Sequence, residues 1–256
     1  MKKEESRQGS SLIFEGMTSI SAVIGADKIT NDRRILSVFV DRERAGGKKK
    51  ELAWLSHRAD ENGFAINYVS SDEIDALSTG NSHGGIIAEC SDRTISPLTS
   101  SDVKPDGFYV MIEGIEDPYN FGYAIRSLYA CGVDGIVLSP RNWMSAAGVV
   151  CRSSAGASEL LPVYTTDGID FVSVFKSVGY KVISAGIRDS VSSFDADLKK
   201  PLLLIVGGEK RGISSSLLDL SDEIVRIDYG REFNGSLSAA SAATVLGYEV
   251  MRQNRK

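Results

Sequence analysis

A glycine-rich turn, VGGEKRGIS from Val206 to Ser214, is the segment whose residues most directly suggest chemistry. Glycine lets a backbone approach a ligand closely, as a phosphate cradle requires. Neither phosphate pattern fits, because the second glycine of a dinucleotide fingerprint falls on Glu209 and the lysine of a P-loop falls on Ile213. The turn therefore predicts a ligand that is neutral or positive at this point. The alternative is a tight turn that carries a surface acid.

A second segment, IEDPYNFGYAIRSLYACG from Ile115 to Gly132, places an arginine one to two turns into an expected helix. An arginine that faces a cleft at the end of a strand can hold a phosphate through two parallel hydrogen bonds. Asn120 precedes Arg126 by about 1.7 helical turns, which puts the two on different sides of a helix unless Asn120 is still in the loop. A surface or ion-paired arginine is the more ordinary interpretation of Arg126.

A third segment, IDYGREFNGSLSAASAATVLGYEV from Ile227 to Val250, is rich in small residues. A helix that starts among them can bring its backbone against another chain segment or a ligand. A small-residue helix packed on a sheet explains the same pattern, so this segment alone decides little.

These segments follow expected strands, and strands that alternate with helices predict a mostly parallel sheet covered on both faces. In such sheets ligands bind beyond the carboxyl ends of the strands. The expected helices begin near Asn120, Asn142, Asp170 and Ser236. The expected strands cover residues 108–115, 134–139, 160–165, 181–186, 202–206 and 223–229.

The front of the chain predicts a separate small α/β unit. Strands are expected at 35–41, 65–70 and 85–90, with a helix that ends at Gly63 and another that is capped by serine near residue 70. Residues 91–107 hold two prolines and four serines without an apolar period, which is typical of a linker. The predicted domains are therefore 1–100, with an N-terminal helix, a linker at 101–107, and 108–256.

Composition narrows the class of protein further. The 256 residues are 42% hydrophobic and 25% charged, and the longest apolar run, at 202–206, is far shorter than the roughly 20 residues of a membrane span. No secretory signal pattern is present at the start. Cys90, Cys131 and Cys151 are odd in number and widely spaced, and only His57 and His83 could supplement them. We expect a soluble cytoplasmic protein without a structural metal.

The net charge of −5 predicts no strong nonspecific attraction to a polyanion. Local clusters, Lys48–Lys50 and Lys210 with Arg211, could still form basic patches on an acidic whole. Solvated surface charge is the simpler interpretation of either cluster.

Taken together, the motifs resemble those of the SpoU (TrmH-type) ribose methyltransferases of the SPOUT superfamily. DPYNFGYAIRS, VGGEKRGIS and GSLSAASA are similar to the family's three ordered motifs, and CRSSAGASELLPVY to a further segment between the first two. The front unit resembles the small RNA-binding domain that many members carry, including a His-Gly pair at His83 and Gly84. The resemblance extends from about Phe14 to Arg252.

This resemblance implies a carboxyl-terminal trefoil knot that holds S-adenosyl-L-methionine, and a homodimer that acts on RNA, more often ribosomal than transfer RNA for members with such a front domain. The implied reaction is methyl transfer to a ribose 2′-hydroxyl. The implied cofactor contacts are Ala185 as a wall and the backbones of Gly207, Gly208, Ile227, Ser236 and Leu237. The implied catalytic residues are Arg126, Asn120, Glu209, Ser236 and Ser238.

Two positions depart from the family pattern: Ser238 replaces an asparagine and Asp228 replaces a proline. A shorter side chain at Ser238 removes a hydrogen bond worth about 1 kcal/mol. An RNA-binding protein of the same fold with weakened or lost catalysis is therefore the alternative hypothesis. A nucleotide-dependent oxidoreductase would bind NAD at Gly207, and Glu209 argues against it.

Overall fold

The computed structural model describes residues 12–80, 83–139, 146–208 and 210–255, and its backbone contacts divide the chain into two units. Unit 1 comprises residues 1–94 and 143–160, and unit 2 comprises residues 95–142 and 161–256. The expected boundaries differ from these units in two respects. Residues 143–160, which we expected in the second domain, belong to unit 1, and residues 95–107, expected as a domain end and linker, belong to unit 2. Asn142, the expected start of a helix, lies outside the described residues.

Unit 1 has a four-stranded sheet in the order β1-β4-β2-β3, formed by β1 (Ile13–Glu15), β2 (Ile35–Asp41), β3 (Ala65–Val69) and β4 (Ile86–Cys90). β2 and β3 are parallel, whereas β4 is antiparallel to both β1 and β2. The three expected strands are confirmed; β1 was not expected. The helices are α1 (Gly16–Gly25), α2 (Lys49–Asn62), α3 (Ser71–Leu77), α5 (Ala147–Ser153) and α6 (Ala157–Leu160).

Local sequence signals explain the ends of these helices. Ser70 and Glu73 form a reciprocal capping box at the start of α3, and α2 ends at Gly63, whose φ of 75° is in the left-handed region that glycine adopts without strain. One core cluster joins Ile20 of α1 and Leu55 of α2 to the sheet, while a second joins Ile74 of α3 to Ile87 on the opposite side of β4. The helices therefore cover both faces of this sheet.

A buried polar network attaches α6 to the rest of unit 1. Arg33 Nε lies 3.0 Å from Glu159 Oε2, with side chains 6% and 3% exposed, and Asn31 Nδ2 donates to the same carboxylate at 2.8 Å. The Arg33 guanidinium also lies over the Phe14 ring, 4.8 Å from its centroid. Because a buried charge without a partner is costly, this network fixes the place of residues 143–160 in unit 1.

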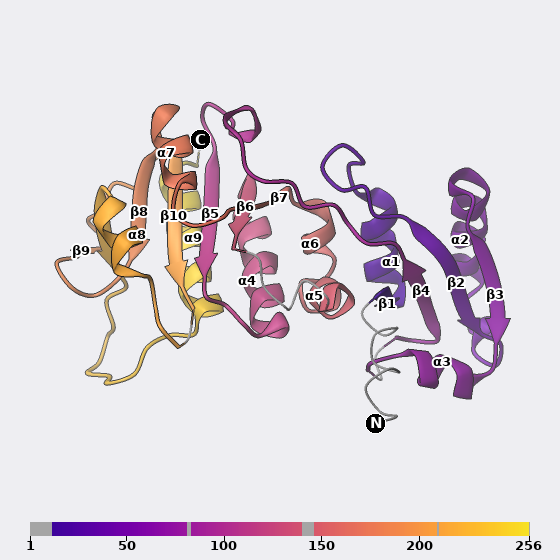
Figure 1. Cartoon of the computed structure of the whole chain (residues 1–256). Helices are drawn as coiled ribbons and strands as arrows, with labels where there is room; N and C mark the ends of the chain where they lie inside the picture. The colour runs from indigo at the N-terminus through magenta and orange to yellow at the C-terminus, as the bar shows by residue number, and fades with distance from the viewer. Residues whose placement is uncertain (1–11, 81–82, 140–145, 209, 256) are drawn as a thin grey trace, which may run out of the picture. The chain divides into compact units, whose positions relative to one another are not determined.

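Unit 2 has a seven-stranded, wholly parallel sheet in the order β7-β6-β5-β10-β8-β11-β9 (Figure 1). This confirms the predicted mostly parallel α/β sheet. Its strands are β5 (Phe108–Glu113), β6 (Gly135–Leu138), β7 (Val163–Thr165), β8 (Lys181–Ala185), β9 (Val191–Ser192), β10 (Leu202–Gly207) and β11 (Glu223–Arg226). Its helices are α4 (Pro118–Ala130), α7 (Phe171–Ser177), α8 (Ser215–Leu220) and α9 (Ala239–Gln253).

Helices α7 and α8 cover one face of this sheet, and α4 and α9 pack together on the other (Figure 1). Gly247 permits the close approach of α4 and α9, since a Cβ there would lie 3.0 Å from Leu128. At the sheet edge, Leu98 N donates to Thr165 O, and Thr165 N donates to Ser96 O. The segment expected as a linker therefore extends the edge of unit 2 beside β7.

Candidate functional site

The loops at the carboxyl ends of β8, β10 and β11 enclose a cavity of about 430 Å³. Parallel strands bring these ends to one edge of the sheet, so segments far apart in sequence meet there. The lining includes all six residues that were expected to contact a cofactor: Ala185, Gly207, Gly208, Ile227, Ser236 and Leu237. The cavity also contains the aromatic rings of Tyr229 and Phe233.

Gly207 and Gly208 allow two chain segments to approach without side chains between them. A Cβ at Gly207 would lie 2.5 Å from the carbonyl carbon of Gly212, and one at Gly208 would lie 2.4 Å from Gly114 O. Gly208 N also donates to Glu113 O at 2.6 Å. Any side chain at either glycine would meet backbone, so both positions require glycine for reasons of space.

Glu113 holds this turn from the neighbouring strand, a role that no sequence pattern predicts. It pairs in register with Gly207, and its Oε2 accepts a hydrogen bond from Ser214 N at 2.8 Å. The carboxylate thereby fixes the far end of the glycine turn. Only the register of β5 against β10 reveals this contact, because Glu113 lies far from Ser214 in sequence.

The loop between β11 and α9 is braced by aromatic contacts. The Tyr229 and Phe233 rings meet edge to face with centroids 5.8 Å apart, and Tyr229 OH accepts from Leu237 N at 3.2 Å. A Cβ at Gly235 would lie 2.5 Å from the Phe233 ring, so the ring rests on the Gly235 backbone. These contacts hold Ser236 and Leu237 against the cavity.

Arg226 is the one formally charged side chain in the described lining, and it is already neutralised. Its Nε donates to Asp228 Oδ1 at 2.8 Å, and its Nη1 donates to Ser190 O at 2.6 Å. Hydrogen bonds from Ser192 and Arg226 lower the pKa of Asp228, so that carboxylate stays ionised. Asp228, which replaces the family's proline, therefore links β9 to β11. The cavity offers apolar surface and backbone polar groups to an organic ligand.

Arg126 and Asn120 both lie in α4 and neither lines the described cavity. Asp117 caps this helix, with its Oδ1 accepting from Asn120 N at 2.7 Å, and Pro118 occupies the first turn. Asn120 is therefore helical rather than part of the loop, and the two side chains leave different sides of α4. Arg126 is exposed and forms no ion pair within the described part of the chain.

The expected catalytic serines have different surroundings. Ser236 lines the cavity, whereas Ser238 is the N-cap of α9 and its Oγ accepts from Ser241 N at 3.2 Å. Ser238 therefore has a structural task that asparagine performs equally well. Glu209 lies outside the described residues.

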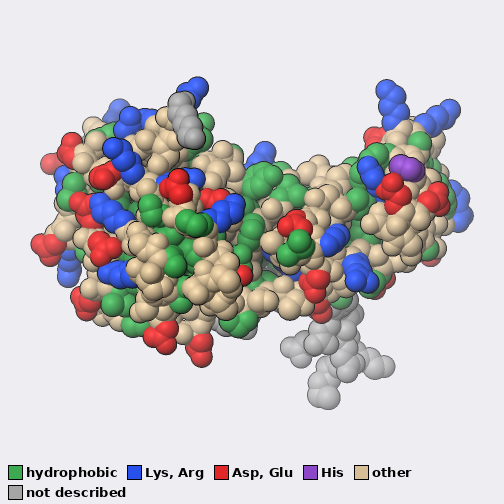
Figure 2. Space-filling view, turned by 90° about the horizontal axis from the view of Figure 1, so that it is seen from above, with side chains coloured by type: hydrophobic (Ala, Val, Ile, Leu, Met, Phe, Trp, Pro, Cys, Tyr) green, Lys and Arg blue, Asp and Glu red, His purple; other side chains and the backbone are tan. Residues whose placement is uncertain are grey.

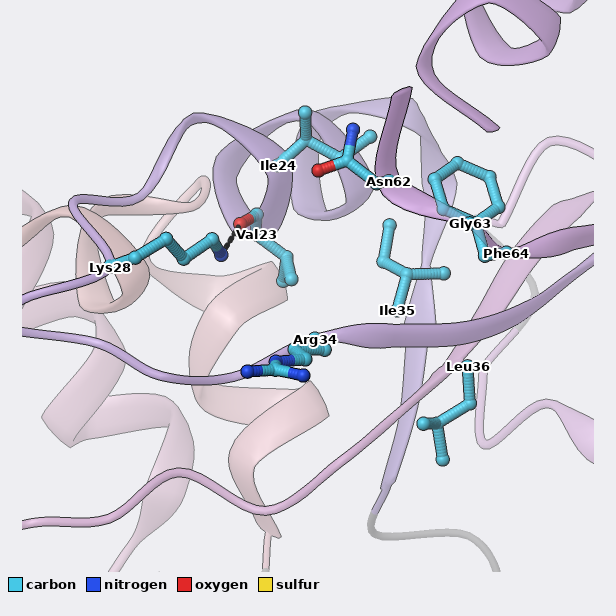
Figure 3. Close-up of a pocket in the computed structure, with 9 residues that line it drawn as sticks. All are labelled: Val23, Ile24, Lys28, Arg34, Ile35, Leu36, Asn62, Gly63 and Phe64. Atoms are coloured by element: carbon cyan, nitrogen blue, oxygen red, sulfur yellow. Dashed lines mark hydrogen bonds between the residues drawn. The ribbon is translucent and has the colours of Figure 1, made fainter. Parts of the chain in front are cut away.

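A second cavity, of about 460 Å³, lies in unit 1 between α1, α2 and the start of β2 (Figure 3). Its floor is apolar, with Ile35 and Phe64, and its polar rim includes Lys28 and Arg34. Lys28 Nζ donates to Val23 O and Arg33 O, both at 2.9 Å, so it caps the end of α1. Burial lowers the pKa of Lys28. The lining contains no carboxylate, histidine or thiol that could share a proton with Lys28, so this cavity presents no acid–base pair.

The described residues include neither a membrane-spanning helix nor a metal-binding cluster. None of the described helices has the length and apolar character needed to traverse a bilayer. Across the described ranges, no three His, Cys, Asp or Glu side chains gather in an arrangement that could bind a metal ion. The three cysteines are buried, and burial raises the pKa of Cys90 to about 12, which makes it a poor nucleophile.

Solved structures of RNA methyltransferases share this fold. A solved RNA 2′-O ribose methyltransferase aligns with 98% of this chain and 96% of its own, with a TM-score of 0.78 at 21% identity. The AdoMet-bound rRNA methyltransferase of Sinorhizobium meliloti has the same TM-score at 20% identity, covering 98% of this chain and 95% of its own. At these identities the likeness establishes the fold.

The family itself is shown by sequence. The model described as the SpoU rRNA Methylase family matches residues 107–248, and that for RNA 2′-O ribose methyltransferase substrate binding matches residues 15–95. The chain belongs to the SpoU rRNA methylase family and is an RNA methyltransferase of the SpoU/TrmH class. The 23S rRNA (guanosine-2′-O-)-methyltransferase RlmB of Shewanella oneidensis is 25% identical over 82% of this chain and 87% of its own length. An uncharacterized tRNA/rRNA methyltransferase of Mycobacterium leprae is 30% identical over 80% of this chain and 68% of its own length.

Proposed function

We propose that this protein transfers a methyl group from S-adenosyl-L-methionine to a ribose 2′-hydroxyl of ribosomal RNA, in the cytoplasm. The observation that carries the proposal is the cavity in unit 2, whose lining unites all six expected cofactor contacts from three separate loops. The relative from Shewanella, whose name specifies a 23S rRNA guanosine 2′-O-methyltransferase, supports the choice of ribosomal RNA. We assign RNA binding by the front of the chain to residues 15–95, which match the substrate-binding model.

The cavity fits this cofactor by size and by chemistry. Its volume of about 430 Å³ lies in the range of small-molecule sites. Gly207, Gly208, Ile227, Ser236 and Leu237 offer backbone groups to the adenosine and amino-acid parts, with Ala185 as a wall. Arg226 is neutralised by Asp228, so it adds little repulsion toward a cation. When bound, S-adenosyl-L-methionine supplies the electrophilic methyl group on its sulfonium.

We also propose that the carboxyl-terminal part of unit 2 is threaded as a trefoil knot. The insertion of β10 between β5 and β8 supports this topology, because β10 follows both of them in sequence.

In the proposed reaction, Arg126 holds the phosphate next to the target ribose and stabilises negative charge that develops on the 2′ oxygen. Arg126 is a poor general base, because removal of its proton at neutral pH costs about 7 kcal/mol. The 2′ proton therefore leaves late or to water. We assign Glu209 to orienting Arg126 and the ribose, and Ser236 to a hydrogen bond within the site. Asn120 leaves a different side of α4 from Arg126, so we assign it to orienting the ribose alone. The N-cap position of Ser238 argues against a direct catalytic role for it.

A homodimer would complete this site, because Arg126 does not line the described cavity of its own chain. The exposed face of α4 carries Tyr119 and Tyr123 beside Arg126, and the neighbouring helix α9 exposes Val245 and Tyr248. We propose that this aromatic face forms the interface with a second copy. Each Arg126 would then act at the partner's cavity.

Calorimetric titration of the full chain with S-adenosyl-L-methionine tests the proposal. We expect saturable binding, and no binding at millimolar cofactor would refute the enzyme. Mapping of 2′-O-methyl groups in ribosomal RNA from a deletion strain should then show one site lost. Cofactor and RNA binding without methyl transfer would instead favour the RNA-binding alternative.

A further inference from the structure

The rim of the unit 2 cavity carries three arginines on three different loops. Arg188 follows the lining residue Ile187, Arg211 precedes the lining residue Gly212, and Arg231 lies between the lining residues Tyr229 and Phe233. Each lies within two residues in the chain of a residue that lines the cavity. The loops that carry them follow β8, β10 and β11, so all three arginines belong to the edge of the sheet that holds the cavity (Figure 1).

These arginines are exposed and form no ion pair or side-chain hydrogen bond with any described residue. Most other cations of unit 2 are paired: Lys104 and Lys200 with Asp134, Lys176 with Asp222, Lys181 with Glu223, Lys210 with Glu116, Arg226 with Asp228 and Arg252 with Glu249. Beyond the three arginines, the described unpaired cations of this unit are Arg126, Lys199 and Arg255.

Unpaired charge at the rim matters because the protein is acidic as a whole. On the face shown in Figure 2, cations and carboxylates alternate over the surface, so no continuous basic field attracts a polyanion there. Asp189 and Glu232 adjoin two of the arginines in sequence, yet neither is ion-paired with them. Arginine also suits the task better than lysine, because its planar fork binds phosphate through two bonds and stacks on bases.

Phe233 adds an apolar surface among these cations. Its side chain is 60% exposed, although one edge contacts Tyr229 and the ring rests on Gly235. A ring that is held on one side and open on the other is suited to stacking of an unpaired base. Arginines that alternate with an aromatic platform are the usual composition of a surface for single-stranded nucleic acid.

We propose that this rim, defined as Arg188, Arg211, Arg231 and Phe233, is the surface by which unit 2 grips single-stranded RNA around the target nucleotide. The arginines bind successive phosphates and Phe233 stacks on a base. The inference rests on the proposed function only in taking RNA as the ligand, and it assigns to these four residues a part in recognition rather than in methyl transfer.

The test is RNA binding as a function of salt, with a single-stranded uridine oligomer as the probe and fluorescence anisotropy as the readout. Each Arg→Gln substitution should lower the slope of log K against log salt by about 0.7, and the triple variant by about 2. The triple variant K104Q/K176Q/K181Q is the matched control, because its lysines are paired in the same unit, and it should keep the wild-type slope. A wild-type slope in the arginine variant would overturn the proposal, as would a wild type that fails to bind the oligomer at low salt.

Phe233 is tested by a pair of variants. Phe233→Ala should weaken oligomer binding by about 5- to 150-fold without changing the salt slope, and Phe233→Trp should restore it. Loss of cofactor affinity in Phe233→Ala with unchanged RNA affinity would mean that the ring serves the cofactor and not RNA, and would refute the platform. The outcomes are separable from the proposed function, because a wild type that binds the oligomer but not S-adenosyl-L-methionine refutes the enzyme and leaves the rim intact.

Discussion

Arg126 is an exposed arginine without an ion pair among the described residues, in a helix that does not line its own cavity. Arg126→Ala should abolish methyl transfer while cofactor affinity stays within a few fold, since the side chain meets RNA rather than the cofactor. Arg126→Lys should recover little, because it lacks the planar fork. Arg255→Ala, at an equally unpaired position, is the control in a methyl-transfer assay with labelled cofactor. Near-normal turnover of Arg126→Ala would refute the assigned role.

Replacement of Gly208 by alanine adds one methyl group at the cavity wall. Gly208→Ala should weaken cofactor binding by at least tenfold, because its Cβ would sit 2.4 Å from Gly114 O and force two backbone segments apart, at a cost of about 1–3 kcal/mol. Gly230→Ala is the matched control in the same cavity region, since a Cβ there meets nothing within 4 Å. Equal cofactor affinities for the two variants, measured by calorimetry, would contradict this account.

The buried hydrogen bonds and ion pair of Glu159 hold α6 against a segment that is distant in sequence. Glu159→Ala should lower the free energy of unfolding by about 3–5 kcal/mol, because it leaves the Arg33 charge buried without its carboxylate. Glu61→Ala removes a carboxylate from an exposed pair with Arg58 and should cost less than about 1 kcal/mol. Urea denaturation followed by circular dichroism measures both. A small effect at Glu159 would mean that water reaches Arg33.

Elements with strong local signals were predicted well from sequence. Gly63 and Ser70 define helix ends through backbone conformation and side-chain capping, so their neighbours in sequence suffice to reveal them. β1 was missed because three residues carry too little pattern and depend on pairing with β4. The start of α9 was placed at Ser236 rather than Ala239, since the cap at Ser238 is one of several serines that could serve.

The parallel sheet alone predicted a site beyond the carboxyl ends of the strands, where the loops after β8, β10 and β11 gather at one edge. The choice of Ala185, Gly207 and Ile227 within that edge came from the resemblance to the family. Glu113 could not be found this way, because its contact with Ser214 depends on register between strands distant in sequence. The position of Arg126 outside the cavity lining was equally hidden, since helical phase does not say whether the side chain faces the carboxyl ends of the strands.

At the scale of the whole molecule, ionisation of Asp134 should make the free energy of unfolding depend on pH. Burial disfavours the ionised form of Asp134, but hydrogen bonds from Lys104 and Phe108 N and the charges of Lys104 and Lys200 outweigh it and lower the pKa. The stabilisation is therefore complete above the unfolded pKa of about 3.9 and is lost as pH falls through the lower folded value. Asp134→Asn should lower the free energy of unfolding by about 1 kcal/mol at neutral pH. In acid, below the folded pKa, the variant and the wild type should be equally stable. Asp219→Asn, at an exposed carboxylate of α8, is the control and should match the wild type at every pH. Thermal melting measured across this pH range tests both variants.

The second prediction for the whole molecule concerns the proposed homodimer. Tyr248→Arg should shift the proposed dimer toward monomer, because it puts a charge into an aromatic interface. Phe194→Arg alters another exposed ring, outside α4 and α9, and should leave the molecular mass in solution unchanged. Light scattering after gel filtration gives the mass, and a monomeric wild type would refute the dimer. A monomeric Tyr248→Arg should also lose methyl transfer.

The path of the chain between the two units limits how the protein can be divided. It completes most of unit 1, begins unit 2, returns at residues 143–160 and then leaves again. No single peptide-bond cleavage can therefore release either half intact. A fragment that ends at residue 94 would lack the carboxylate of Glu159, and one that starts at 95 would carry an orphaned stretch of the other half. Exchange of either unit between relatives would accordingly require two coordinated crossovers.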